Sequence, residues 1–113
     1  MKKINIVKNN IEFNKIINTG KVYKNRYFSI YILEKNKKYY RFGIAVSKKT
    51  GNAVTRNKIK RQIRNIISNS NINYDFFDYV IIARKEILNI NYQLIEKELL
   101  KLLSNINKEN YNE

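Results

Sequence analysis

The sequence predicts one small α/β domain. Its 113 residues are enough for a single modest hydrophobic core and too few for two. Two stretches, 22–33 and 39–48, alternate in their side chains with the period of two that is typical of β-strands. Three other stretches, 9–19, 54–69 and 91–106, place apolar side chains at helical spacing. Helices and strands that alternate along one chain without repeats favour a single α/β unit, here 1–113.

The first predicted helix and the strand after it are defined by their apolar residues. Gly20 is expected to end the helix, since glycine is favoured just past a helix C-terminus. The apolar positions at helical spacing are Phe13, Ile16 and Ile17. One face of the strand 22–33 is expected to point to the core through Phe28, Ile30 and Ile32. The opposite face carries Tyr27, Ser29 and Tyr31.

A polar hairpin connection, 34–38, leads to the strand 39–48. Its expected core residues are Phe42, Ile44 and Val46, and its other face carries Gly43, Ala45 and Ser47. The segment 78–84 is predicted to be a buried strand. The last helix packs on the sheet through one apolar stripe formed by Tyr92, Ile95, Leu99, Leu102, Leu103 and Ile106. We expect order over about 8–105 and a frayed Asn-rich tail over 106–113.

Positive charge is the strongest compositional feature of the chain. The formal net charge is +14, with 23 Lys and Arg against 9 Asp and Glu. A charge of this size repels itself in a compact chain, so an anionic polymer is the expected partner. Of the basic residues, 18 lie in 1–64, where there are only two acids. The partner surface is therefore expected in the first half of the chain.

The composition also excludes several classes of protein. There is no Cys and no His, which excludes disulfides, thiolate chemistry, a Ser-His-Asp triad and a His-based zinc site. Asp75 and Asp78 are the only aspartates. The chain acting alone is therefore a poor candidate for an enzyme. No apolar run is long enough to span a membrane, and the first residues lack the apolar core of a signal peptide, so a soluble cytoplasmic protein is expected.

The segment 51–65 carries the pattern with the clearest chemistry. At about 100° per residue, its polar residues Arg56, Asn57, Lys60, Arg61 and Arg64 cover an arc of roughly 140°, and Lys58 lies somewhat beyond it. The facing stripe is formed by Ile59, Ile63, Ile66 and Ile67. No acid relieves the repulsion between these cations, which favours phosphate as the ligand. An ordinary basic surface helix is the alternative interpretation.

The loop before this helix strengthens the phosphate interpretation. Lys48 and Lys49 bring two more cations to the helix N-terminus, where free N–H groups also favour anions. The series Ser47-Lys48-Lys49, Gly51-Asn52-Ala53-Val54, Arg56-Asn57-Lys58 and Lys60-Arg61 closely resembles the signature of the bacterial ribonuclease P protein component. Further positions agree with that family's pattern: Lys8, Asn9, Phe13, Gly20, Asn25, Arg26, the strand 27–33 and the segment 78–84.

The resemblance implies both a fold and a function. The family fold is an α/β sandwich with the basic helix in a left-handed crossover between parallel strands. For this chain we predict the element order α-β-β-α-β-α and a mixed sheet. In that family the protein is the small subunit of a ribonucleoprotein endonuclease that removes 5′ leaders from precursor transfer RNAs. The catalyst is the RNA, which holds the Mg²⁺ ions that activate water. No catalytic residue, metal ligand or organic cofactor is implied on the protein, and neither DNA nor a membrane is an expected partner.

The resemblance also implies two binding surfaces. Contacts with the catalytic RNA are implied for Lys48, Lys49, Arg56, Asn57, Lys58, Lys60, Arg61 and Arg64. A cleft for the single-stranded leader is implied along Phe13, Ile17, Tyr27, Ser29, Tyr31, Ala45 and Ser47. Aromatic rings stack on bases of any sequence, which suits a leader of variable sequence. Core packing for Phe13 and Ile17, and a strand-stabilising aromatic pair for the tyrosines, remain the alternatives. The chain departs from the usual family pattern at Lys58, commonly Arg, and at Ile17, commonly aromatic.

Three other functions share some of these features. A general RNA-binding or ribosome-associated protein would have the same basic face without needing a leader cleft. A helix-turn-helix DNA regulator is disfavoured because strands, rather than a partner helix, flank the basic helix. A protein-only nuclease would need clustered carboxylates, which the basic half lacks.

Overall fold

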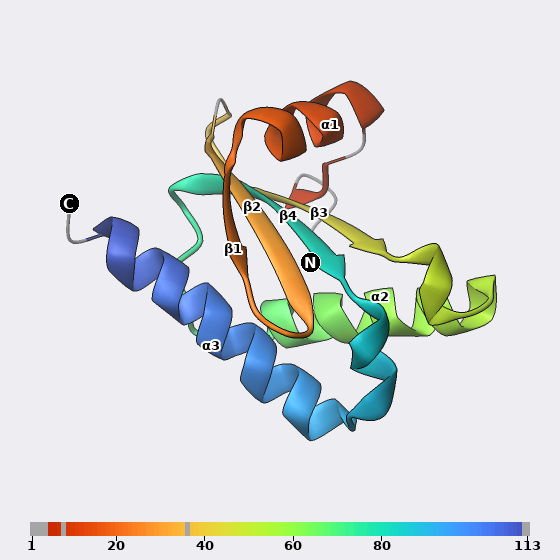
Figure 1. Ribbon diagram of the computed structural model, residues 1–113. Coiled ribbons are helices and arrows are strands. Elements are labelled where there is room, and N and C mark those ends of the chain that lie inside the picture. Colours follow the sequence, from red (N-terminus) through yellow and green to blue (C-terminus); the bar gives the residue numbers. More distant parts are fainter. Residues whose placement is uncertain (1–4, 8, 36, 112–113) are drawn as a thin grey trace.

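The computed structural model describes residues 5–7, 9–35 and 37–111, so the predicted role of Lys8 lies outside the described residues (Figure 1). The helices are α1 (Asn10–Thr19), α2 (Ala53–Ser68) and α3 (Tyr92–Tyr111), and the strands are β1 (Lys21–Lys24), β2 (Phe28–Glu34), β3 (Arg41–Val46) and β4 (Phe77–Ala83). Two short 3₁₀ turns, η2 (Lys48–Thr50) and η3 (Lys85–Asn89), follow β3 and β4. The predicted helices and strands are therefore present, with one division described below.

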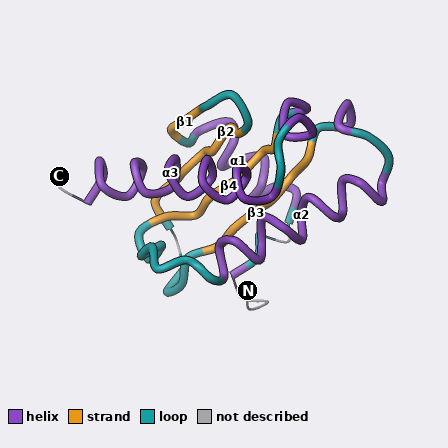
Figure 2. Tube along the Cα trace, turned by 90° about the horizontal axis from the view of Figure 1, so that it is seen from below, coloured by secondary structure: helices purple, strands orange, loops and turns teal. Residues whose placement is uncertain are grey.

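The four strands form a mixed sheet in the order β1-β2-β4-β3. β2 pairs antiparallel with β1 and β4, whereas β3 pairs parallel with β4. The connection between the parallel strands contains α2, so the basic helix is the crossover. α1 covers one face of the sheet, and α2 and α3 cover the other (Figures 1 and 2). The α/β fold with a mixed sheet is confirmed, and the left-handed sense of the crossover stays a prediction from the resemblance.

The predicted strand 22–33 is wrong in one respect, because it is a hairpin of two strands. The carboxamide oxygen of Asn25 accepts hydrogen bonds from the backbone N–H groups of Tyr27 and Phe28, at 2.9 and 2.8 Å. The Asn25 N–H donates in turn to the carbonyl of Phe28. These local bonds replace the ladder of a continuous strand and reverse the chain. The sheet consequently has four strands instead of the three expected.

Gly20 ends α1 as predicted, but for a different reason. Its φ of −78° is open to any residue, so no left-handed conformation is involved. A Cβ on Gly20 would lie 2.5 Å from the carbonyl oxygens of both Ile16 and Ile32. Glycine is needed here because α1 passes into β1 in direct contact with the β2 backbone.

Two apolar clusters lie on opposite faces of the sheet. The larger one joins Phe28, Ile30, Ile32 and Phe42 to the apolar faces of α2 and α3, as the strand alternation predicts. The smaller one lies under α1 and centres on Val7, Ile16 and Val80. Tyr27 is a correction: it packs against the larger cluster instead of the α1 face, because it belongs to the turn before β2.

The expected tail is also wrong, because α3 continues to Tyr111. Ile106 is fully buried, and the Tyr79 hydroxyl donates to the Asn107 side chain at 3.1 Å. Burial raises the pKa of the Tyr79 phenol above its ordinary value, and the bond to Asn107 opposes that shift. Further along, the Asn110 side chain donates to the Tyr23 hydroxyl. The last two turns of α3 therefore belong to the core.

The α3 C-terminus provides a direct test of this correction. Replacing Ile106 with Ala should lower the free energy of unfolding by about 2–5 kcal/mol, since it opens a cavity in the larger cluster. Urea denaturation followed by circular dichroism measures the change. The control is Asn105→Ala, which alters an exposed neighbour and should stay within about 0.5 kcal/mol of the parent. Equal stability of the two variants would contradict this correction and support the original prediction of a frayed tail.

Candidate nucleic-acid interface

The basic helix α2 is anchored by its apolar stripe and by its first turn. Ile59, Ile63, Ile66 and Ile67 are all buried in the larger cluster, as the helical spacing predicts. The Asn52 side chain caps the N-terminus by accepting from the Thr55 N–H at 2.9 Å. Gly51, with a φ of +140°, makes the turn that places the cap, in a conformation that other residues rarely adopt.

The opposite side of α2 presents the cations to solvent. Asn57, Lys58, Arg61 and Arg64 are exposed, and Lys60 is partly buried. Arg56 is also partly buried, and its guanidinium donates to the carbonyl of Gly51. It therefore also stabilises the turn into the helix, a second role that the spacing alone did not indicate.

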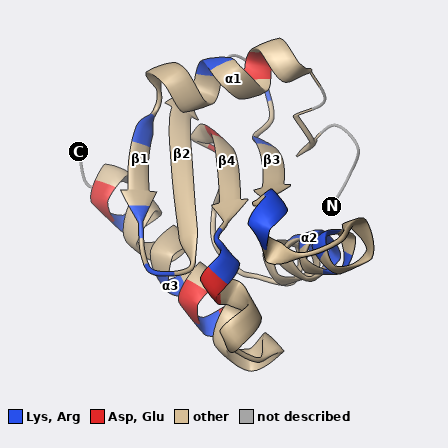
Figure 3. Ribbon diagram, turned by 45° about the vertical axis from the view of Figure 1, so that its right-hand side comes forward, with Lys and Arg blue, Asp and Glu red and all other residues tan. Residues whose placement is uncertain are grey.

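The loop between β3 and α2 extends this charge to the sheet. Lys48 and Lys49 are exposed in η2, and the Ser47 hydroxyl accepts from the Lys49 N–H. η2 packs beside η3, which follows β4. Figure 3 shows the basic residues of η2, α2 and the segment after β4 gathered at the end of the sheet to which β3 and β4 point. All eight predicted RNA contacts belong to η2 and α2, and we call the surface that these eight residues form the cationic surface.

The sheet face under α1 follows from the register of three strands. Side chains directly opposite one another share a face, which gives three rows across β2, β4 and β3. The rows are Ser29–Ile82–Ala45, Tyr31–Val80–Gly43 and Leu33–Asp78–Arg41. α1 lies over the last two rows: a Cβ on Gly43 would come within 2.7 Å of the Phe13 ring. Glycine at this position lets the ring rest on the sheet backbone.

The first row continues into an open pocket of about 430 Å³ at the end of the sheet. Among its lining residues are Ser29 and Ser47, which were predicted for the leader cleft, and Lys49, which was predicted to contact the catalytic RNA. The other lining residues are Ile82, Ala83, Arg84, Lys85 and Glu86. Lys49 belongs to both the pocket and the cationic surface. A strip of the sheet face therefore runs from the α1 cluster to the cations of η2.

Phe13, Ile17 and Tyr31 lie beside this strip. All three pack against the smaller cluster and remain partly exposed. Core packing is therefore confirmed for Phe13 and Ile17, while part of each side chain stays accessible. Ala45 lies in the first row opposite Ile82. Of the predicted cleft residues, only Tyr27 lies elsewhere, against the larger cluster.

Sequence reasoning missed the contribution of β4 to the strip. Ile82 forms part of its floor, and Arg84 and Lys85 form part of its cationic end. The segment 78–84 is apolar on both faces, so it shows no alternation that would single out Ile82. The sequence did offer one indication, because two basic residues, Arg84 and Lys85, directly follow the apolar residues of this strand.

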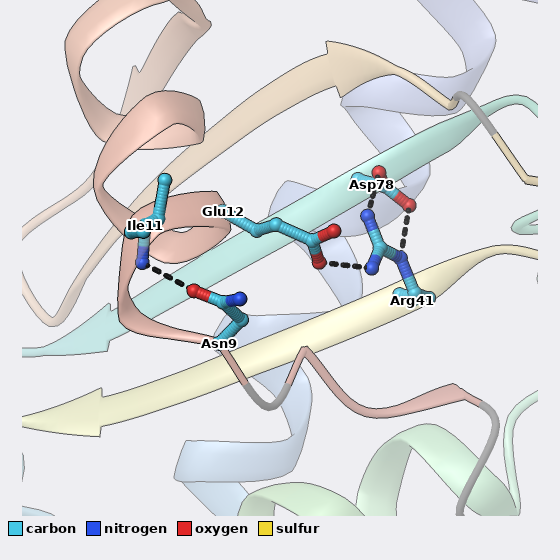
Figure 4. Close-up of polar contacts among 5 residues, drawn as sticks. All are labelled: Asn9, Ile11, Glu12, Arg41 and Asp78. Atoms are coloured by element: carbon cyan, nitrogen blue, oxygen red, sulfur yellow. Dashed lines mark hydrogen bonds and ion pairs between the residues drawn. The ribbon is translucent and has the colours of Figure 1, made fainter.

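A buried arginine ties α1 to the sheet (Figure 4). The Arg41 guanidinium donates to both carboxylate oxygens of Asp78, at 2.8 and 3.3 Å, and also to the carboxylate of Glu12 on α1. Arg41 and Asp78 are only 6% and 3% exposed. The hydrogen bonds with Asp78 raise the pKa of Arg41, burial opposes them, and Glu12 adds to the rise. Asp78, one of the two aspartates of the sequence, is thus committed to an ion pair.

The described residues hold neither a cluster of metal-binding side chains nor a membrane-spanning helix. In 5–7, 9–35 and 37–111, no three His, Cys, Asp or Glu side chains gather where a metal ion could be held. Within the same ranges, no helix is long and apolar enough to cross a membrane.

The family model described as Ribonuclease P matches residues 1–107. The chain belongs to this family. A ribonuclease P protein component from Streptococcus agalactiae serotype III is 48% identical over 103 residues, covering 91% of this chain and 94% of the relative. Another, from Mycoplasma mycoides subsp. mycoides SC, is 43% identical over 108 residues, covering 94% and 99%.

Solved ribonuclease P proteins have the same fold. The Staphylococcus aureus protein superposes with a TM-score of 0.79 at 36% identity, over 88% of this chain and 93% of that one. The Thermotoga maritima protein gives 0.72 at 34% identity, over 81% and 88%. The chain is therefore a protein subunit of ribonuclease P, an RNA-containing enzyme of transfer RNA processing. The resemblance drawn from the motifs is confirmed.

The buried ion pair yields a stability prediction. Replacing Asp78 with Ala should lower the free energy of unfolding by about 3–5 kcal/mol, because it leaves the Arg41 guanidinium without its buried, bidentate carboxylate partner. The control makes the same substitution at Asp75, whose side chain is exposed. Denaturant titration of both variants measures the difference. A loss at Asp78 no larger than at Asp75 would contradict this account of α1 attachment.

Proposed function

We propose that this subunit binds the catalytic RNA of ribonuclease P through the cationic surface and the 5′ leader of precursor transfer RNA through the strip beside α1. The observation that carries the proposal is the contact between the two surfaces at Lys49. One continuous surface then holds the substrate's single strand next to the RNA that cuts it.

The contact with the catalytic RNA is supported by the charge of α2 and η2. Neither element contains an acid, and the cations lie on consecutive turns around Asn57. Arginine forks suit phosphate oxygens, and lysines add mobile charge. Such a surface binds the backbone and carries no sequence information of its own.

Binding of the leader is supported by the composition of the strip. Partly exposed rings from α1 and β2, Phe13 and Tyr31, offer stacking surfaces to bases. Ser29, Ala45 and Ser47 are small and leave room for a backbone, while Lys49, Arg84 and Lys85 provide cations for its phosphates. Stacking and charge together accept many sequences, as a leader site must.

Hydrolysis belongs to the RNA subunit in this proposal. Mg²⁺ held mainly by the RNA would supply the activation of water for attack on the scissile phosphodiester. The protein's residues position the leader and neutralise phosphate charge beside the RNA, and none takes part in a proton transfer.

Reconstitution is the first experiment. With a bacterial ribonuclease P RNA at low magnesium concentration, leader release from a precursor transfer RNA should require both the RNA and this protein. Tight RNA binding without stimulated cleavage would favour the general RNA-binding alternative. Cleavage by the protein alone would overturn the assignment of catalysis to the RNA.

The cationic surface is tested by Arg61→Ala combined with Arg64→Ala. Both side chains are exposed and do not support the turn as Arg56 does. Affinity for the catalytic RNA should fall, and the slope of log K against log salt should flatten by about 0.7–0.9 for each lost phosphate contact. The control, Lys97→Ala with Lys101→Ala, also removes two exposed cations, but from α3. An unchanged slope in the arginine variant would contradict the assignment.

The leader strip is tested by Phe13→Leu and Tyr31→Leu, which keep apolar packing and remove a ring. Each should weaken binding of a leader-bearing substrate about tenfold, with little effect on a leaderless transfer RNA. Leu33→Ala is the control, since it loosens the same cluster without removing a ring. Direct binding to the reconstituted complex supplies both affinities. Equal losses for the two substrates would show that the rings serve only the core.

A further inference from the structure

A second pocket lies beside the cationic surface and shares no lining residue with the pocket of the leader strip. It has a volume of about 390 Å³ and lies between α2, η3 and the start of α3. Its size falls within the usual range for pockets that hold small organic groups. None of its ten lining residues is acidic. This pocket plays no part in the proposed leader binding.

The floor and one wall of the pocket are apolar. Ile59, Ile87 and Ile95 are buried there, each at most 5% exposed. Leu88 stands at the edge with 53% of its surface exposed. A flat apolar group entering the pocket would cover part of Leu88.

The rim carries the polar groups. Thr55 and Gln62 come from α2, and Asn91 immediately precedes α3, where its side-chain oxygen accepts from the Leu94 N–H. The Tyr92 ring lines the pocket as well, and its hydroxyl accepts from the Asn65 side chain of α2 at 3.1 Å. This bond joins α3 to α2 across the site, so the walls are held in place without a ligand.

The positive charge beside the pocket favours a ligand attached to phosphate groups. Lys58 lines the pocket and is three residues before Arg61 and four before Gln62, so all three lie on neighbouring turns of one helix side. An RNA strand bound to the cationic surface would pass the pocket mouth. A nucleobase has two apolar faces and a polar edge, which match the apolar wall and the amide-bearing rim.

We propose that this pocket takes one unstacked nucleobase of the catalytic RNA, whose backbone is held by Lys58 and Arg61. The proposal rests on the proposed contact between α2 and that RNA. It adds a contact that depends on shape and hydrogen bonding to a surface that otherwise binds by charge.

The test uses Leu88→Ala and Gln62→Ala in the full chain with the RNA subunit. Leu88→Ala should weaken RNA binding about 5- to 10-fold, because only part of the leucine surface is available to cover a base. Gln62→Ala should weaken it in the same direction. The salt slope should stay at the parent value, unlike that of the Arg61 and Arg64 variant, since neither change removes a charge. Ile11→Ala, which trims an exposed isoleucine on α1, is the matched control and should leave affinity unchanged.

Chemical probing of Watson–Crick edges gives an independent readout. One unpaired base of the RNA subunit should be protected by the parent protein and become reactive with Leu88→Ala at saturating protein. Parental affinity in both pocket variants, an unchanged protection pattern, or protection of a substrate base instead would overturn the pocket proposal. Failure of the parent protein to bind the RNA at all would overturn the proposed function itself, so the two failures are distinguishable.

Discussion

The position of α1 depends on one buried arginine. Arg41 leaves β3 on the α1 side of the sheet and is held by Asp78 of β4 and Glu12 of α1. A guanidinium this deeply buried is tolerated only where carboxylates surround it, so the three residues fix one another. They hold the helix over two rows of the sheet face, and in the remaining row Ile82 and Ala45 stay partly exposed while Ser29 is buried. The accessible strip exists because the helix is fixed to one end of the sheet.

On the other face of the sheet, the helix α2 is stable although its neighbouring cations repel one another. α2 has no acid in its first turn, and its neighbouring cations repel one another. Its stability comes instead from four isoleucines buried against the sheet and α3, and from the cap that Gly51 and Asn52 form. Because the buried side supports the helix, the exposed side is free to carry unrelieved positive charge. Folding and the proposed RNA contact use different faces of the same sixteen residues.

Periodicity predicted the helices and most of the strands because burial sets both patterns. It failed where local side-chain bonds decide the backbone, as at Asn25, whose carboxamide turns a predicted strand into a hairpin. Composition misled at the C-terminus, where asparagines resemble a tail yet Ile106 and Asn107 bind the core. The link from Arg41 to Glu12 and Asp78 joins positions 29 and 37 residues apart. It depends on the parallel register of β3 on β4, which no local pattern specifies. The position of Ile82 between Ser29 and Ala45 also depends on strand register, so the sequence pattern did not predict it.

The strand order has a consequence for how the chain is made. β4 lies between β2 and β3, yet it is synthesised after both of them and after α2. Until residue 83 has emerged, β2 and β3 have no shared neighbour, and the buried arginine has no aspartate. The segment without its central strand is also the one that holds most of the positive charge. Native pairing is therefore long-range and comes late, so a highly cationic, incompletely folded chain precedes the finished sheet on the ribosome.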